Sequence, residues 1–315
     1  MSFKERLQRI NERYGTLFIL ILMVIITTIL YPGFLSSTNL TNVVRQISII
    51  AIIAFGSTFV IISGGIDLSP GSIVGLTSVV VASLAHPGMY PVIVPIFAGI
   101  IVGSLAGLVN GMIIAKTKIP PFIVTLGMMI AARGAALIYS DGRPIGNFTK
   151  TFEFIGGGDL FGVPVPILIL VMILILSHII LNNTIFGLYT YAIGSNEQAA
   201  MISGINVNKY KVLIYMYAGL MASIAAIVLT SRISSGQPIA GTGFELDAIA
   251  ASVIGGTSLS GGIGTIPGTV IGALIMGILN NAMDLLGVSA YWQQVFKGAI
   301  IVGAVILDQK RKDSK

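Results

Sequence analysis

The chain has 315 residues, of which 55% are hydrophobic and only 10% are charged. A water-exposed surface ordinarily carries about 25% charged residues, so we expect most of this surface to face lipid. The sequence contains no cysteine, which excludes disulfides, thiolate metal sites and cysteine nucleophiles, and its two histidines are too few for a metal cluster. The net charge of +6 does not indicate nucleic-acid binding, because the basic residues fall at the ends of apolar runs. We expect no cofactor.

The amino terminus has the outline of a signal peptide, with basic residues from Lys4 to Arg13 followed by an apolar run. A signal peptide would end in small residues at a cleavage site, whereas this run continues into Tyr31-Pro32-Gly33. We therefore predict that the first apolar run is a retained transmembrane helix.

Runs of about 20 apolar residues are long enough for a helix to cross the hydrocarbon layer of a membrane. The candidate spans are 14–31, 43–62, 71–86, 92–115, 122–139, 165–182, 210–231, 246–262, 265–285 and 292–308. These runs are continuous rather than alternating, which favours helices over a β-barrel. The sequence predicts an all-α integral membrane protein, a polytopic bundle of about ten helices. Glycines interrupt the eighth and ninth runs, so some helices are expected to be broken or re-entrant.

The distribution of Lys and Arg predicts the orientation of this bundle. If the amino terminus is cytoplasmic, the inner segments hold Lys4, Arg6, Arg9, Arg13, Lys116, Lys118, Lys209, Lys211, Lys310, Arg311, Lys312 and Lys315. The outer segments hold only Arg143, Lys150 and Arg232. This bias places both termini in the cytoplasm. No loop is long enough for a soluble domain, so residues 1–315 are predicted to form one membrane domain.

The chain has no G-x-x-x-x-G-K-[ST] phosphate loop, so ATP-driven work would require a partner chain. The strongest local feature is the predicted inner loop 194–205, which contains apolar residues at nearly helical spacing. Ser195 or Asn196 would cap its start, and Gly204 would end it. A short helix at the cytoplasmic surface could dock in a groove on another protein, or it could pack beneath the bundle.

Two glycine-rich segments resemble each other: 63–72 reads SGGIDLSPGS and 254–262 reads IGGTSLSGG. Each follows one apolar run and precedes another. Broken helices of this kind meet near the substrate site in many transporters. The alternative is that the glycines only permit close packing of helices. The sequence leaves both interpretations open.

A few polar residues within or beside the spans are candidates for a translocation pathway: Asp67, Asn110, Asn280, Asn281 and Asp284. A carboxylate at membrane depth usually marks function, although Asp67 could instead cap the helix that begins near Ser69. The amides could bond the hydroxyls of a neutral polyol, or they could bond neighbouring helices. Glu245 and Asp247 open the eighth span, where negative charge suits a helix N-terminus.

Several stretches resemble the permease subunits of bacterial ABC importers for monosaccharides, most closely those of the ribose type. They are SGGIDLSPGS (63–72), GSNEQAAMISGINVNK (194–209), SGQPIAGTGFELDAIAA (235–251), IGGTSLSGGIG (254–264), LNNAMDLLGVS (279–289) and the ending 304–310. The resemblance covers nearly the whole chain.

The resemblance implies a multi-pass subunit of the bacterial cytoplasmic (inner) membrane, surrounded by lipid. It implies three protein partners: an ABC ATPase, an extracytoplasmic sugar-binding protein and a second permease copy. The inner loop matches the coupling segment of the family, so the residues expected to contact the ATPase are Asn196, Glu197, Ala199, Ala200, Ser203, Gly204 and Ile205. The chain itself would not be an enzyme.

The expected cargo is a monosaccharide, most readily ribose. Alternative cargoes within the same class are another sugar, a nucleoside or a furanosyl compound. A branched amino acid would need charged partners for both of its termini, and the sequence shows no evident pair. A different class, the ion-coupled secondary carrier, would need paired buried carboxylates, and only Asp67 and Asp284 are candidates.

Overall fold

The computed structural model describes residues 3–117 and 119–313 and, for side chains, leaves out 3–14, 304–305 and 307–313. Lys118 and Lys315 of the charge pattern therefore lie outside the described residues. The elements are α1 (Phe3–Leu30), the 3₁₀ turn η1 (Pro32–Leu35), α2 (Ser37–Ile62), α3 (Pro70–Leu84), α4 (Ile93–Lys116), α5 (Pro121–Ser140), α6 (Lys150–Gly157), β1 (Asp159–Leu160), β2 (Val163–Pro164), α7 (Val165–Asn183), α8 (Ile185–Ser195), α9 (Glu197–Ile202), α10 (Val207–Arg232), α11 (Phe244–Ile254), α12 (Ile266–Leu285) and α13 (Ala290–Asp313). The fold is helical, with one short antiparallel hairpin of β1 and β2.

Six of the described helices are long and apolar enough to cross a membrane: α2, α4, α5, α7, α10 and α12. Two shorter apolar helices, Gly15–Leu30 within α1 and α3, accompany them. A helix lies at each of the predicted spans, but ten crossings stay a prediction. The eighth span differs from its expected bounds, because α11 ends at Ile254 and not at residue 262. Gly256, Gly261 and Gly262 have φ between 74° and 95°, which a right-handed helix cannot accommodate.

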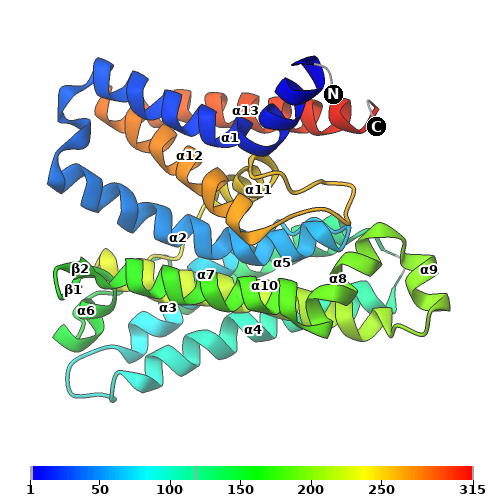
Figure 1. The fold of residues 1–315 in the computed structure, drawn as a ribbon. Helices are drawn as coiled ribbons and strands as arrows, with labels where there is room; N and C mark the ends of the chain where they lie inside the picture. Colours follow the sequence, from blue (N-terminus) through cyan, green and yellow to red (C-terminus); the bar gives the residue numbers. More distant parts are fainter. Residues whose placement is uncertain (1–2, 118, 314–315) are drawn as a thin grey trace.

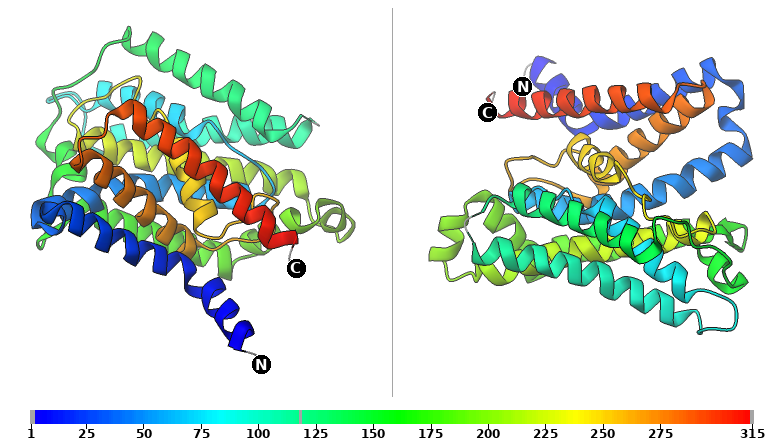
Figure 2. Two further views of the ribbon diagram at one scale, coloured as in Figure 1. Left: turned by 90° about the horizontal axis from the view of Figure 1, so that it is seen from above. Right: turned by 180° about the vertical axis from the view of Figure 1, so that it is seen from behind.

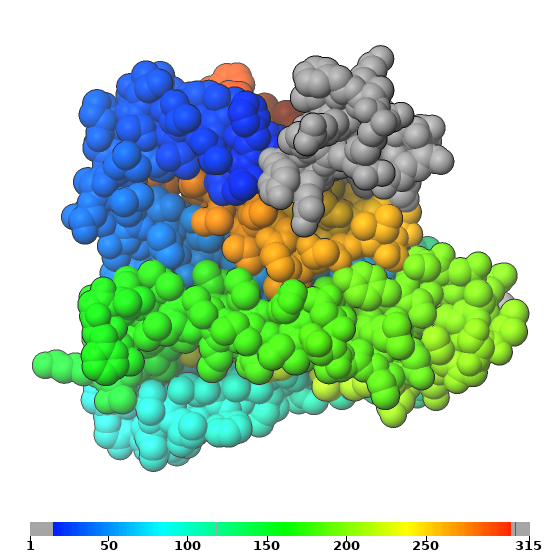
Figure 3. All heavy atoms as spheres, viewed as in Figure 1, coloured from blue at the N-terminus to red at the C-terminus, as the bar shows by residue number. Residues whose placement is uncertain are grey.

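The long helices run in roughly the same direction across the molecule (Figure 1). The hairpin and α6 lie at one end of the bundle, and α9 lies at the other, on the same side as the start of α1 and the end of α13 (Figures 1 and 2). In the space-filling view, the green segments form one band across the face, from the hairpin end to the α9 end (Figure 3).

Helix α2 lies at the centre of the core, and its residues from Ile47 to Ile62 are all buried. Helix α10 packs against α2. It also packs against α4, which carries a stripe of glycines at four-residue spacing. Gly103, Gly107 and Gly111 leave room for the backbone of α10 at Gly219, Tyr215 and Val212. Membrane helices commonly associate through such small residues, because apolar side chains gain little by leaving lipid for protein.

Two short helices begin inside the bundle and not at its ends. Residues 63–69 lead from the end of α2 into α3, and residues 233–243 lead from the end of α10 into α11. Both segments are non-helical, and their backbone polar groups need partners when no water is present. Gly236 pairs with Ile145 as an isolated β-bridge, and Leu68 donates to the Thr125 hydroxyl at 3.2 Å. Of the two runs expected to be interrupted, the eighth breaks after α11 at Ile254, whereas the ninth, α12, is one continuous helix from Ile266 to Leu285.

Candidate functional site

The predicted coupling segment forms a short, well-capped helix, α9. The Asn196 side chain accepts a hydrogen bond from the N–H of Ala199 at 2.9 Å, as expected for an N-cap. At the other end Gly204 has φ of 85°, and Ile205 donates back to Ala200 at 3.1 Å. The helix proper spans Glu197–Ile202, shorter than the predicted 194–205, because α8 continues through Ser195.

The faces of α9 differ in exposure. Ala200 is buried, and Ile205 packs beside it against the ends of α8 and α10. Met201 is 58% exposed and Ile202 is 88% exposed. Glu197 forms an ion pair with Lys211 of α10 at 2.7 Å, which ties the start of α9 to the bundle. The predicted contact with an ATPase stays a prediction, but the helix presents an apolar surface in a fixed position.

The second glycine-rich segment meets the end of α2 beside this helix, at a junction we define as Ile62, Gly194, Gly261 and Gly262. The N–H of Gly262 donates to the carbonyl of Ile62, the last residue of α2, at 2.8 Å. A side chain at Gly194 would overlap the Ile62 carbonyl and the Gly262 amide, so α8 lies against backbone there. The Tyr191 hydroxyl also donates to the Gly264 carbonyl at 2.6 Å. At this junction the glycines permit close packing.

Two of the candidate pathway residues come together in the segment between α2 and α3. Asp67 is 2% exposed and accepts bonds from the Ser69 amide at 2.8 Å and the Ser69 hydroxyl at 2.6 Å. Asn110 of α4 donates to the same hydroxyl at 3.0 Å. Asp67 therefore does bond a backbone N–H, but that amide belongs to Ser69, which itself precedes α3. The carboxylate shapes the turn before α3 and does not cap its first turn.

The other three candidates lie apart from this pair and from one another. Asn280 donates to Asp247 at 3.4 Å, Asn281 exchanges two hydrogen bonds with Asn39 of α2, and Asp284 accepts from Gln293 at 2.8 Å. The bonds of Asn280 and Asn281 join different helices, which is the structural alternative to a pathway role. A single pathway lined by all five residues stays a prediction.

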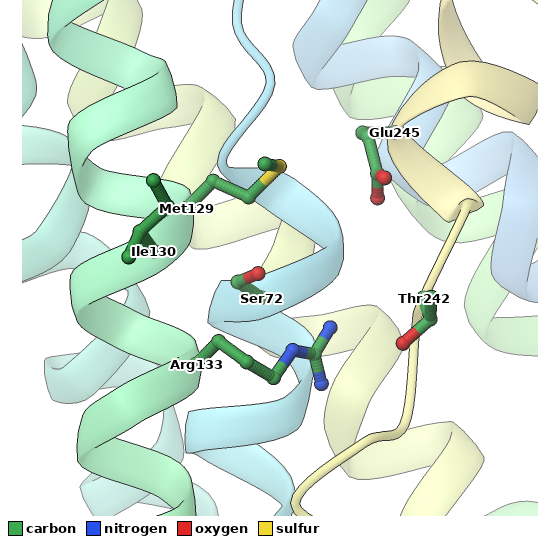
Figure 4. A pocket seen from close by; sticks show the side chains of 6 residues that line it. All are labelled: Ser72, Met129, Ile130, Arg133, Thr242 and Glu245. Carbon is green, nitrogen blue, oxygen red and sulfur yellow. The ribbon is translucent and has the colours of Figure 1, made fainter.

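A cavity of about 300 Å³ lies between α3, α5 and the start of α11. The residues that line it are Ser72, Met129, Ile130, Arg133, Thr242 and Glu245 (Figure 4). Met129, Ile130 and Arg133 lie in the middle of α5, which extends from Pro121 to Ser140. In a helix that crosses a membrane, this position is close to the middle of the hydrocarbon layer.

Arg133 fixes one wall of this cavity. Its guanidinium donates to the carbonyls of Pro238 at 2.5 Å, Ala240 at 3.0 Å and Gly71 at 3.3 Å. These bonds hold the segment 233–243 against the first turn of α3. Of the five N–H groups of an arginine, two remain for another acceptor. Glu245 lies opposite and accepts from the Gly243 amide at 3.2 Å, so a guanidinium and a carboxyl group line the same cavity.

Sequence reasoning missed this cavity. The sequence indicates Glu245 only as a favourable charge at a helix start and does not single out Arg133. The sequence shows no evident pair of charges for an amino acid, whereas the structure brings Arg133 and Glu245 to one cavity. The signal that was available is the position of Arg133 itself: an arginine in the middle of an apolar run needs acceptors, and the segment 233–243 supplies them.

These features define a multi-pass helical membrane protein with helices that begin inside the bundle and a short, partly exposed helix, α9, at one end. Residues 39–305 match the family described as the permease component of branched-chain amino acid transport systems. The chain belongs to this family of transport permeases.

Individual relatives are similar over nearly their whole length. The chain is 50% identical to the ribose import permease protein RbsC of Bacillus subtilis, over 96% of this chain and 94% of that protein. It is 41% identical to the L-arabinose transport system permease protein AraH of Escherichia coli, over 98% and 93% of the two chains. It is 37% identical to the D-allose transport system permease protein AlsC of Escherichia coli, over 95% and 92%. No solved structure matches the chain.

Proposed function

We propose that this chain is the membrane-spanning permease subunit of an ATP-driven ABC importer that carries ribose across the bacterial cytoplasmic membrane. The observation that carries the proposal is the 50% identity to a ribose import permease along nearly the full length of both chains. The lower identities to the arabinose and allose permeases favour ribose among the monosaccharides.

A partner ATPase would supply the energy, and α9 would be its docking site. Support comes from the exposure of Met201 and Ile202 on a helix that is capped at both ends and tied to α10. Exposed apolar side chains beside polar ones are typical of a surface that another protein covers.

The proposed orientation places α9 and both termini in the cytoplasm. The hairpin and α6 would then face the extracytoplasmic sugar-binding protein. A second copy of the permease would complete the assembly within the lipid, as the family resemblance implies.

The test is ribose uptake by proteoliposomes that contain this chain, its ATPase and its sugar-binding protein. Uptake should require all three proteins and ATP. Uptake driven by an ion gradient without the ATPase would favour the ion-coupled carrier and contradict the proposal. Uptake of arabinose, allose or a nucleoside in place of ribose would change the cargo but not the class.

The docking role of α9 can be tested separately with Ile202→Asp, which places a charge on the exposed apolar face. We expect the ATPase to bind several-fold more weakly in a pull-down, with uptake reduced in proportion. Asn208→Asp is the matched control, because it adds the same charge at an exposed position outside α9. Normal ATPase binding by Ile202→Asp would contradict the docking role.

A further inference from the structure

We propose that the cavity lined by Arg133 and Glu245 is a binding site for one neutral monosaccharide, at the middle of the translocation pathway. This inference rests on the proposed function and adds to it the residues that meet the sugar. None of the six lining residues belongs to the pathway candidates that the sequence suggested.

The size and position of the cavity agree with this assignment. Its volume of about 300 Å³ is at the lower limit for small-molecule sites, which suits a single sugar ring. It lies beside the first turns of α3 and α11, where the non-helical segments 63–69 and 233–243 end. Irregular backbone inside a membrane persists where it is buried in protein or lines a cavity, and broken helices commonly flank a substrate site.

The polar groups of the cavity match a polyol. Arg133 retains two N–H donors, and the Thr242 hydroxyl donates to Ile239 at 2.7 Å and so can accept from a ligand. Ser72 adds a hydroxyl from α3, and Glu245 supplies a carboxylate (Figure 4). Adjacent sugar hydroxyls could then donate to Glu245 and accept from Arg133, and hydrogen bonds to charged groups are the stronger kind.

The charges favour a neutral ligand over an anion or a cation. Arg133 and an ionised Glu245 bring opposite charges to one cavity, so a ligand with a net charge would meet one like charge. An amino-acid zwitterion is the competing ligand. The sugar is favoured because the chain is 50% identical to a ribose import permease, and the apolar wall of Met129 and Ile130 suits the C–H face of a sugar ring.

Two glycines of α3 make room for the charged side chains of the cavity. Gly71 and Gly75 lack the Cβ atoms that would overlap the Glu245 carboxylate and the Arg133 guanidinium, respectively. These two glycines therefore let both charged groups lie directly against α3. The cavity exists because α3 presents no side chain at these positions.

The first test measures occupancy of the cavity without transport. Because this chain contains no cysteine, a Thr242→Cys variant carries a single thiol, and the label is read on this chain after the subunits are separated on a denaturing gel. In the assembled complex, saturating ribose should slow the reaction of this cysteine with a methanethiosulfonate reagent several-fold. Thr117→Cys, exposed at the end of α4 and outside the cavity, is the control and should react equally with and without ribose.

The second test is transport by Glu245→Gln, which keeps the shape of the side chain and removes its charge. Loss of one charged hydrogen bond should lower ribose uptake about tenfold at saturating binding protein, while the complex still assembles on size exclusion. Asp141→Asn, at the exposed end of α5 where φ is 50° and asparagine is tolerated, is the matched control and should transport normally.

The outcomes separate the two proposals. Failure of the wild-type complex to take up ribose would overturn the proposed function. Normal wild-type uptake combined with unprotected Thr242→Cys, or with full activity of Glu245→Gln, would overturn only the assignment of this cavity. Protection by leucine or valine instead of ribose would identify a zwitterion site and overturn the polyol assignment.

Discussion

Glu245 and Asp247 lie two residues apart in the first turn of α11, yet they belong to opposite environments. Glu245 faces a cavity and shares it with Arg133. Asp247 is 1% exposed and bonds Lys297 of α13 at 2.9 Å and Asn280 of α12 at 3.4 Å. The sequence assigned both acids the same role at a helix start. The side of α11 on which each carboxylate lies decides whether it bonds neighbouring helices, as Asp247 does, or lines the cavity, as Glu245 does.

This contrast predicts different losses of stability when the buried ion pair of Asp247 and Lys297 is broken and when the bonds of Arg133 beside the cavity are removed. A sealed carboxylate that loses its cation cannot be hydrated, whereas groups beside a cavity can gain a water. Neutral amide pairs between helices should matter least.

The largest effect on stability is expected for Lys297→Met, which leaves the Asp247 carboxylate buried without a cation. Because Lys297 itself is partly exposed, we expect a cost at the low end of the usual range, about 3 kcal/mol. The measurement is thermal unfolding of the purified protein in detergent. The double variant Lys297→Met, Asp247→Asn should recover most of the loss. A single variant as stable as the wild type would show that the two charges do not interact.

A smaller effect is expected for Arg133→Ala, although this variant leaves three carbonyls without their donor. The carbonyls adjoin the cavity, so water can replace part of each bond, and the cost should be about 1–3 kcal/mol. The same unfolding measurement applies. Arg143→Ala, at an exposed arginine after α5, is the control and should change stability little. A loss of stability larger than that of Lys297→Met would contradict the proposed contrast between the groups beside the cavity and the buried ion pair.

The smallest effect is expected at the amide pair of Asn39 and Asn281, which exchange bonds of 2.9 and 3.0 Å. Interhelical bonds of this kind contribute about 0.6 kcal/mol in membrane proteins. A double-mutant cycle with Asn39→Leu and Asn281→Leu measures the coupling directly. A coupling energy above that of the Lys297 and Asp247 pair would contradict the ranking.

Much of the helix placement could be predicted because apolar length is a local property. The short helix α9 was also predictable, since Asn196 and Gly204 act on their own neighbours in sequence. The bonds of Arg133 were not predictable, because its acceptors at Pro238 and Ala240 lie more than 100 residues away. Apolar composition also does not indicate what a helix contacts. In their most apolar stretches, 89% of the residues of α2 are buried but only 17% of those of α5.

The glycine junction beside α9 has a mechanical consequence. Flexible side chains at an interface can change rotamer and absorb a small displacement, but here the carbonyl of Ile62 and the amide of Gly262 meet α8 at Gly194 with nothing between them. A partner that pushed on α9 would therefore shift the end of α2 and the connection from α11 to α12 together. A methyl group at Gly194 would push apart the backbone of α8, of the end of α2 and of the connection from α11 to α12, even without a bound partner.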